Sequence, residues 1–275
     1  MGAFVTALRV LSSGVDSLYF SMRGVLDDHL VDALEVLKTA AQEREAPLIQ
    51  YEAGPSFAVQ PSGWGRFRYW LRSRDFDLFL TPSRTGPAAY LRLASAYLHR
   101  EGAGQAAAEA EAFVGTRVLR DVTGPASPSR VDVYSDFQGW QPAASDLPRF
   151  VTRARARAQH YEPCLSLHDG RRFTGFRFGR DQLLARLYDK THEIGLSGKS
   201  WTADLWQGRD PAAPVWRVEF QFRREVLGQL RLHSVGDALS ARQALWTYGT
   251  EWLSLRTPTA NREQRHWPLD PAWDR

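Results

Sequence analysis

The chain has 275 residues, of which 43% are hydrophobic, and this is the composition of an ordinary globular protein that can bury a core. Its net charge of +4 arises from 35 basic and 31 acidic residues, so a patchy surface is expected and charge alone does not indicate nucleic acid. The single cysteine, Cys164, excludes an internal disulfide and a cysteine-based metal cage. Together with the lack of an apolar run long enough to cross a bilayer, it predicts a soluble protein of the cytoplasm, without a membrane partner.

The first part of the chain predicts a strand, a helix and a meander. Weak alternation over Val15–Met22 predicts a strand, after which Asp27 or Asp28 caps an amphipathic helix that extends to about residue 41. Three segments between residues 61 and 93 alternate with period two and are separated by turn residues, which is typical of an antiparallel meander. An alanine-rich stretch over 105–118 predicts a second helix.

Pro125 and Pro128 interrupt the chain near its midpoint. The elements predicted after them are a strand over 129–137, a helix over 146–161, a hairpin of 173–178 and 183–190, a strand over 215–224 and a helical stretch over 237–255. Both parts then follow the order strand, helix, strands, helix. This predicts an α+β fold of antiparallel sheets flanked by helices, either as two similar halves at 1–124 and 125–275 or as one continuous domain.

Three predicted strands of the second half each place polar residues on one face, because residues two apart in a strand share a face. These residues are Arg130, Asp132, Tyr134 and Asp136 in the first strand, Arg186, Tyr188 and Lys190 in the second, and Arg217, Glu219, Gln221 and Arg223 in the third. Such carboxylates can converge on Mg²⁺ or Mn²⁺, with Asp132, Asp136 and Glu219 as ligands and the cations holding phosphates. The alternative is an ordinary half-exposed sheet with cross-strand Arg–Glu pairs.

Arginine supplies the other candidate contacts to nucleic acid. All basic residues except three are arginine, whose planar group suits phosphate, although a GC-rich genome explains the same bias. Arg149, Arg153 and Arg157 recur every four residues and would line one side of the helix predicted over 146–161, where they form either a phosphate-binding edge or a solvated face. Trp64 and Trp70, in the predicted meander, are the better candidates for base stacking.

Three parts of the chain carry a resemblance to a known family, and they are SRVDVYSDF, TGFRFGR followed by RLYDK, and WRVEFQFRR. They resemble the signature segments of the replication initiation factor family of the Rep-trans type. This family covers rolling-circle initiators of plasmids and phages and related relaxases of integrative elements. The resemblance implies a protein that binds an origin and cuts one strand of a single-stranded loop by metal-assisted attack of a tyrosine, which gives a 5′-phosphotyrosine and a free 3′-OH. By motif, Asp132, Asp136 and Glu219 match the acidic positions and Arg217 the phosphate-facing position.

The sequence departs from that family at the nucleophile. The tyrosine that precedes the glycine of the hairpin is replaced by the stretch Phe176–Gly179, which has no hydroxyl group. Tyr188 near Lys190 is the best placed substitute, and Tyr161 or Tyr134 are further candidates. No Gly-x-x-x-x-Gly-Lys-Ser/Thr loop is present, so unwinding would fall to a host helicase.

The sequence therefore predicts a DNA-binding replication initiator that makes a metal-dependent single-strand nick, with Tyr188, Lys190 and Arg217 as catalytic residues. Arg130 and Arg186 join the helical arginines as predicted DNA contacts. Two alternatives stay open, which are a non-catalytic origin-binding protein of the same fold and a metal-dependent nuclease that uses water as its nucleophile.

Overall fold

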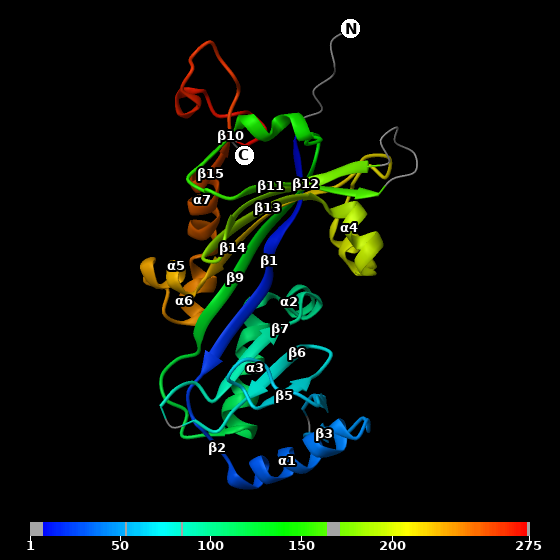
Figure 1. Cartoon of the computed structure of the whole chain (residues 1–275), viewed down its shortest axis with the longest axis vertical. Helices are drawn as coiled ribbons and strands as arrows, with labels where there is room; N and C mark the ends of the chain where they lie inside the picture. Colours follow the sequence, from blue (N-terminus) through cyan, green and yellow to red (C-terminus); the bar gives the residue numbers. More distant parts are fainter. Residues whose placement is uncertain (1–7, 53, 84, 164–170, 274–275) are drawn as a thin grey trace. The chain divides into compact units, whose positions relative to one another are not determined.

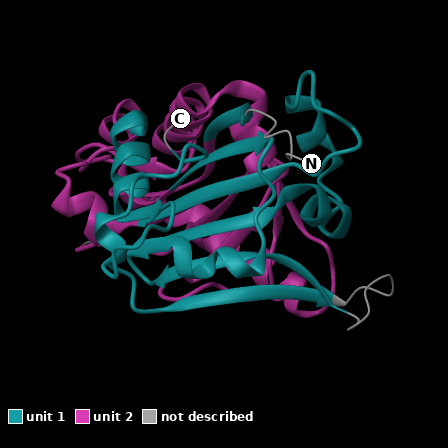
Figure 2. Ribbon diagram, turned by 90° about the horizontal axis from the view of Figure 1, so that it is seen from above, with its two compact units in different colours: residues 1–14, 132–222, 242–275 teal, residues 15–131, 223–241 magenta. Residues whose placement is uncertain are grey.

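A computed structural model describes residues 8–52, 54–83, 85–163 and 171–273, and Cys164 lies outside these residues. The chain forms two compact units (Figure 2), of which unit 1 comprises 1–14, 132–222 and 242–275 and unit 2 comprises 15–131 and 223–241. Strands β1 (Arg9–Met22) and β9 (Ser127–Gln138) contribute residues to both units. The units are thus discontinuous, and the halves predicted at 1–124 and 125–275 coincide with neither of them.

The strands of unit 2 follow the order β1-β7-β6-β5-β4-β3 (Figure 1). Each strand in this order is antiparallel to its neighbour. Its elements besides β1 and β9 are β2 (Val25–Leu26), α1 (Asp28–Gln42), β3 (Leu48–Gln50), β4 (Ser56–Val59), β5 (Tyr69–Arg72), β6 (Phe76–Leu80), β7 (Ala89–Leu93), α2 (Ser95–Glu101), α3 (Ala103–Arg117), β8 (Leu119–Arg120), α5 (Arg224–Gln229) and α6 (Val235–Ser240). The predicted strand, helix and meander of the first part are confirmed.

Helices of unit 2 cover one face of its sheet. Asp27 caps α1 by accepting hydrogen bonds from the backbone of His29 and Leu30, as the sequence predicts. Phe76 of β6 contacts the rings of Tyr97 in α2 and Phe113 in α3. Because side chains alternate along a strand, this face also takes the buried leucines of β6 and leaves Asp77 and Phe79 on the other face.

The strands of unit 1 follow the order β11-β12-β13-β14-β9-β1, in which each neighbouring pair from β11 to β14 is antiparallel. Its elements besides β1 and β9 are η1 (Ala144–Arg149), β10 (Phe150–Thr152), β11 (Arg157–Pro163), β12 (Arg171–Arg180), β13 (Leu183–Asp189), α4 (Lys190–Ser197), η2 (Ser200–Leu205), β14 (Trp216–Arg223), α7 (Arg242–Trp252), β15 (Leu253–Leu255) and η3 (Gln264–His266). The predicted hairpin and both predicted strands of this part are confirmed. The fold is therefore the expected α+β arrangement of antiparallel sheets and flanking helices.

The predicted helix over 146–161 is wrong. A short 3₁₀ helix ends at Arg149, Phe150 opens β10, which pairs with β15, and Arg157 opens β11, which pairs with β12. Phe150 is fully buried and contacts the rings of Phe176 and Phe178. Strand pairing and burial of this ring thus outweigh the modest helix propensity of the segment.

Among the described residues, no helix combines the length and the apolar character that crossing a membrane requires.

Helix α7 packs closely on β14, which gives a first testable prediction. A Cβ atom on Gly249 would lie 2.6 Å from the ring of Phe220, whereas a Cβ atom on Gly195 in α4 would meet nothing within 4 Å. Gly249→Ala is expected to lower the free energy of unfolding by about 1–3 kcal/mol through overpacking. Gly195→Ala is expected to raise it by up to about 1 kcal/mol, because alanine favours helix. Urea denaturation measures both, and equal effects would contradict this account of the packing.

Candidate functional site

Polar side chains lie on one face of the central strands of unit 1. In the sheet register Arg186 of β13 is opposite Glu219 of β14, and Tyr188 is opposite Arg217. Arg186 and Tyr188 are half-buried, whereas Ala185 and the other apolar residues of β13 are buried. The predicted alternation of β13 is therefore present. It places Arg186 and Tyr188 directly beside Glu219 and Arg217 of β14.

Arg186 lies between two of the predicted acidic residues. Its guanidinium donates to Glu219 Oε1, and its Nη2 is 3.6 Å from Asp132 Oδ2. Both carboxylates are almost fully buried, while the Arg186 side chain keeps 38% of its surface exposed. The charge-assisted hydrogen bond fixes the position of Glu219 at the edge of solvent.

Tyr188 joins the same cluster through its hydroxyl group. Its Oη lies 3.1 Å from Glu219 Oε2, so a phenol and a carboxylate share one hydrogen bond. The Nζ atom of Lys190 is 5.7 Å from the centre of the Tyr188 ring and also pairs with Glu193. Lys190 is buried and is the first residue of α4. Strand β13 therefore ends at Asp189, one residue earlier than predicted.

Arg217 and Asp136 form a fully buried ion pair, with no exposed surface on either side chain. Arg217 Nε is 2.6 Å from Asp136 Oδ1 and Nη2 is 2.9 Å from Oδ2, while the indole of Trp206 donates to Oδ2 at 2.8 Å. The guanidinium also lies 3.9 Å from the centre of the Tyr134 ring, and the Tyr134 hydroxyl is 2.8 Å from Ser12 Oγ. In this arrangement Arg217 points into the protein and not toward a phosphate in solvent.

The three acidic residues do not fit a single metal ion as they are arranged. Both oxygens of Asp136 are engaged by Arg217 and Trp206, and the position between Asp132 and Glu219 is taken by the guanidinium of Arg186. Within the part of the chain that the structure describes, no three His, Cys, Asp or Glu side chains come together in a group able to hold a metal. The predicted ligand set of Asp132, Asp136 and Glu219 therefore does not form a site for Mg²⁺ or Mn²⁺ in this arrangement.

Asp189, the acid of the RLYDK segment, has a structural position. Its carboxylate caps α4 by accepting from the His192 backbone at 2.9 Å and pairs with Arg172 of β12. It thereby fixes the direction in which the chain leaves β13, directly after Tyr188.

A pocket of about 320 Å³ opens beside Tyr188 and Arg186. Besides these two residues it is lined by His160 and Glu162 of β11, by Thr174, Gly175 and Phe176 of β12, and by Asp189, His192, Glu193 and Leu196. A Cβ atom on Gly175 would lie 2.8 Å from the Tyr188 backbone, so glycine is needed opposite the tyrosine. The sequence pattern did not indicate His160 and Glu162 as lining residues, because the segment that contains them was predicted to be helical.

The other predicted DNA contacts are spread over different environments. Arg130 belongs to unit 2, where it lies over the ring of Tyr19. Arg149 is half-buried in ion pairs with Asp146 and Asp270, whereas Arg153 and Arg157 are exposed. The single helical edge proposed for Arg149, Arg153 and Arg157 is thus wrong, because these residues belong to a 3₁₀ helix, a bend and a strand.

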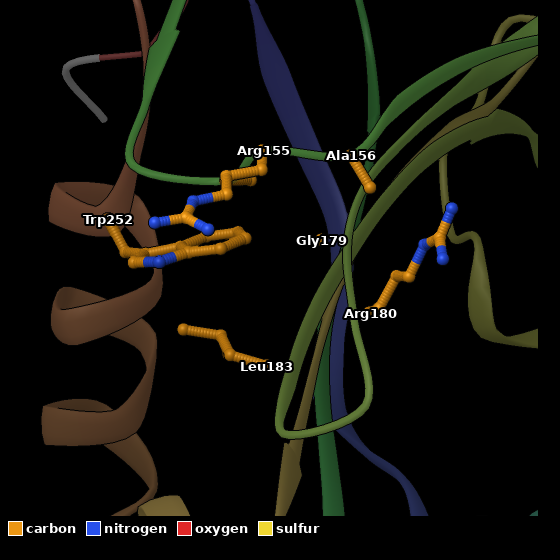
Figure 3. Close-up of a pocket in the computed structure, with 7 residues that line it drawn as sticks. Arg155, Ala156, Gly179, Arg180, Leu183 and Trp252 are labelled. Carbon is orange, nitrogen blue, oxygen red and sulfur yellow. The ribbon is translucent and has the colours of Figure 1, made fainter.

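A second pocket, of about 500 Å³, lies at the opposite end of β13 (Figure 3). Trp252 of α7 packs closely on Gly179, since a Cβ atom there would lie 2.9 Å from the indole. Arg155 extends toward Trp252 in this view, and Arg180 points away from it. The described residues that line this pocket are apolar or basic, so it differs in charge from the acidic cluster near Tyr188.

Comparison with known proteins gives a likeness of structure. No protein-family model matches the chain, and a search of curated proteins finds no match by sequence. The fold is similar to that of a solved rolling circle replication initiator protein from Geobacillus stearothermophilus, with a TM-score of 0.54 and 14% sequence identity. The similarity covers 97% of this chain and 94% of that chain. The two proteins therefore share a fold over almost their whole lengths.

Proposed function

We propose that this chain is a DNA-binding replication initiator that recognises an origin and cuts one strand with Tyr188 as the attacking residue. The shared fold with a rolling circle replication initiator supports the role in replication. The observation that carries the proposed chemistry is the 3.1 Å contact between Tyr188 Oη and Glu219 Oε2 at the edge of an open pocket. A phenol beside a carboxylate is the pairing that an activated oxygen nucleophile requires.

The proposed cut is a transesterification. Tyr188 Oη forms a bond to the phosphorus atom as its proton passes to Glu219, and the bond from phosphorus to the 3′ oxygen breaks. The 3′ oxygen takes a proton from water, so the products are a 5′-phosphotyrosine and a free 3′-OH. Arg186, half-exposed next to Glu219, is placed to offset the charge of the phosphate.

Burial distinguishes Tyr188 from the two other tyrosines considered. Tyr134 is buried under Arg217, with its hydroxyl directed to Ser12, so a phosphodiester cannot approach it in this conformation. Tyr161 is exposed, but its hydroxyl contacts the neutral amide of Gln159, which is a poor proton acceptor. Tyr188, in contrast, combines a carboxylate partner with half-exposure beside a pocket.

The test uses a supercoiled plasmid that carries the DNA flanking the gene of this chain. The protein is incubated with it in Mn²⁺, in Mg²⁺ or in EDTA, and relaxed DNA and protein-linked 5′ ends are measured. Covalent 5′ ends support the proposal, and free nicked ends favour a nuclease that uses water. Loss of cutting in EDTA would support the predicted metal dependence, and the absence of any binding would contradict a role on DNA.

A second candidate function is a non-catalytic origin-binding protein. The observation in its favour is that Phe176 and Phe178, at the position where the resembled family has its tyrosine, are buried against Phe150. Both rings belong to the hydrophobic core, and neither offers a hydroxyl group to DNA. Sequence-specific binding to the plasmid without cleavage in any of the three incubations would favour this candidate. Assistance by a host helicase remains a prediction.

A further inference from the structure

The sheet of unit 2 has a face on which aromatic rings and arginines alternate. In the register of β1, β7, β6 and β5, one cross-strand row is Tyr19, Arg92, Asp77 and Arg72, and a second is Ser21, Tyr90, Phe79 and Trp70. This is the face opposite the one that α2 and α3 cover through Phe76. We call these eight residues, together with the turn Trp64–Phe67, the aromatic–arginine face.

A tight turn holds Trp64 over this face. Trp64 and Phe67 exchange backbone hydrogen bonds of 3.0 and 2.9 Å across Gly65 and Arg66, and Gly65 has a φ of 56°, which favours glycine. The Trp64 ring stacks on Tyr90, with centres 5.6 Å apart, yet 45% of the residue stays exposed. A large indole is thus positioned by its own turn and by the Tyr90 ring, and it is partly open to solvent.

Arg92 occupies the middle of the face, and none of the ion pairs among the described residues involves it. Its guanidinium carbon lies 3.9 Å from the centre of the Trp64 ring and 4.7 Å from that of Phe79. Its buried Nε has no hydrogen-bond partner among the residues that the structure describes. The neighbouring Asp77 is instead 3.3 Å from Arg72. The guanidinium therefore packs against both rings, whose centres are 5.4 Å apart, and the rings stabilise its positive charge without neutralising it.

We propose that the aromatic–arginine face binds single-stranded DNA, with an unpaired base stacked on Trp64. Aromatic rings beside cations bind single strands because every base has a flat face and every linkage has a phosphate. In a duplex the base faces are already stacked inside the helix and cannot reach an indole. Arg66 at the tip of the turn and Arg72 beside Trp70 are both exposed and placed to meet the phosphates. This inference rests on the proposed function, since it assigns the single strand to unit 2 and the chemistry to unit 1.

The test measures binding of the full chain to a labelled oligo-dT strand of about 15 nucleotides by fluorescence anisotropy. Trp64→Ala is expected to weaken binding about tenfold, which is the usual contribution of one stacked base. Trp64→Phe, which keeps a ring, is expected to retain most of the affinity. The matched control is Trp267→Ala in unit 1, because that half-buried indole donates to the Asn261 carbonyl and is not part of the aromatic–arginine face. Each variant is first shown by circular dichroism to unfold at the temperature of the wild type.

A strand of the same length without bases separates stacking from charge. The wild-type protein is expected to bind this abasic strand about tenfold more weakly than oligo-dT, and Trp64→Ala is expected to bind the two strands equally. The inference is overturned if Trp64→Ala binds oligo-dT as tightly as the wild type. It is equally overturned if the substitution lowers the affinity for oligo-dT and for the abasic strand by the same factor. It is also overturned if the substitution changes only the oligomeric state, since the face would then contact a second copy. Failure of the proposed function looks different, because the wild type itself would then bind neither oligo-dT nor the plasmid.

Discussion

Replacing Arg217 with methionine is expected to lower the free energy of unfolding by about 3–5 kcal/mol, because it leaves the carboxylate of Asp136 buried without its cation. Both side chains of the pair have no exposed surface, and Trp206 offers Asp136 only one further hydrogen bond. Chemical denaturation of the variant and the wild type measures this loss directly. A loss below about 1 kcal/mol, typical of an exposed pair, would show that the ion pair is open to water.

The double variant Asp136→Leu with Arg217→Met is the control for this prediction. Replacing both partners by apolar residues of similar size removes the unpaired charge, so most of the stability is expected to return. The exposed pair of Arg265 and Glu263 supplies a second comparison, since Arg265→Ala is expected to cost at most about 1 kcal/mol. If the double variant is no more stable than Arg217→Met, burial of the unpaired Asp136 charge is not the cause of the loss.

Tyr188→Phe is expected to abolish the protein-linked 5′ ends completely while the affinity for plasmid DNA stays within about twofold of the wild type. The substitution removes the proposed attacking oxygen and leaves the ring in place, and Glu219 keeps its ion pair with Arg186. Denaturing gels of the plasmid reaction measure the covalent product, and filter binding measures the affinity.

Tyr161→Phe is the matched control, because it removes an exposed tyrosine hydroxyl that contacts only Gln159 among its described hydrogen-bond partners. It is expected to form as much covalent product as the wild type. Covalent product with Tyr188→Phe and none with Tyr161→Phe would move the nucleophile to β11. Equal activity of both variants would point to a different nucleophile.

Much of the fold could be predicted from local patterns. The period of two over β9, β13 and β14, and the cap of α1 at Asp27, depend on neighbouring residues and are correct in the structure. The segment around Phe150 could not be predicted in this way, since its two short strands exist through pairing with β15 and β12, which lie elsewhere in the sequence. The arginines and alanines over 153–158 alternate with period two, but only Arg157 and Ala158 of this stretch belong to β11.

The residues of the candidate site could be predicted from the sequence, but the burial of their side chains could not. Alternation alone places Arg186 and Tyr188 on one face of β13, and Glu219 with Arg217 on one face of β14. It does not say that the register sets Arg186 opposite Glu219, nor that Trp206 reaches Asp136 from the segment between α4 and β14. The exposure of a polar face depends on such contacts with residues that are distant in the sequence. Two residues expected to bind phosphate and metal, Arg217 and Asp136, therefore form a buried ion pair with each other.

The discontinuity of the two units has a consequence for the gene. All of the candidate residues from Asp132 to Glu219 precede residue 242, yet unit 1 also includes the segment that follows it, in which α7 packs on Phe220. A frameshift or stop codon near residue 241 would therefore leave every candidate site residue encoded while removing the helix that covers the apolar side of their sheet. Truncated copies of such a gene are expected to yield aggregating and inactive product, however well their site motifs are preserved.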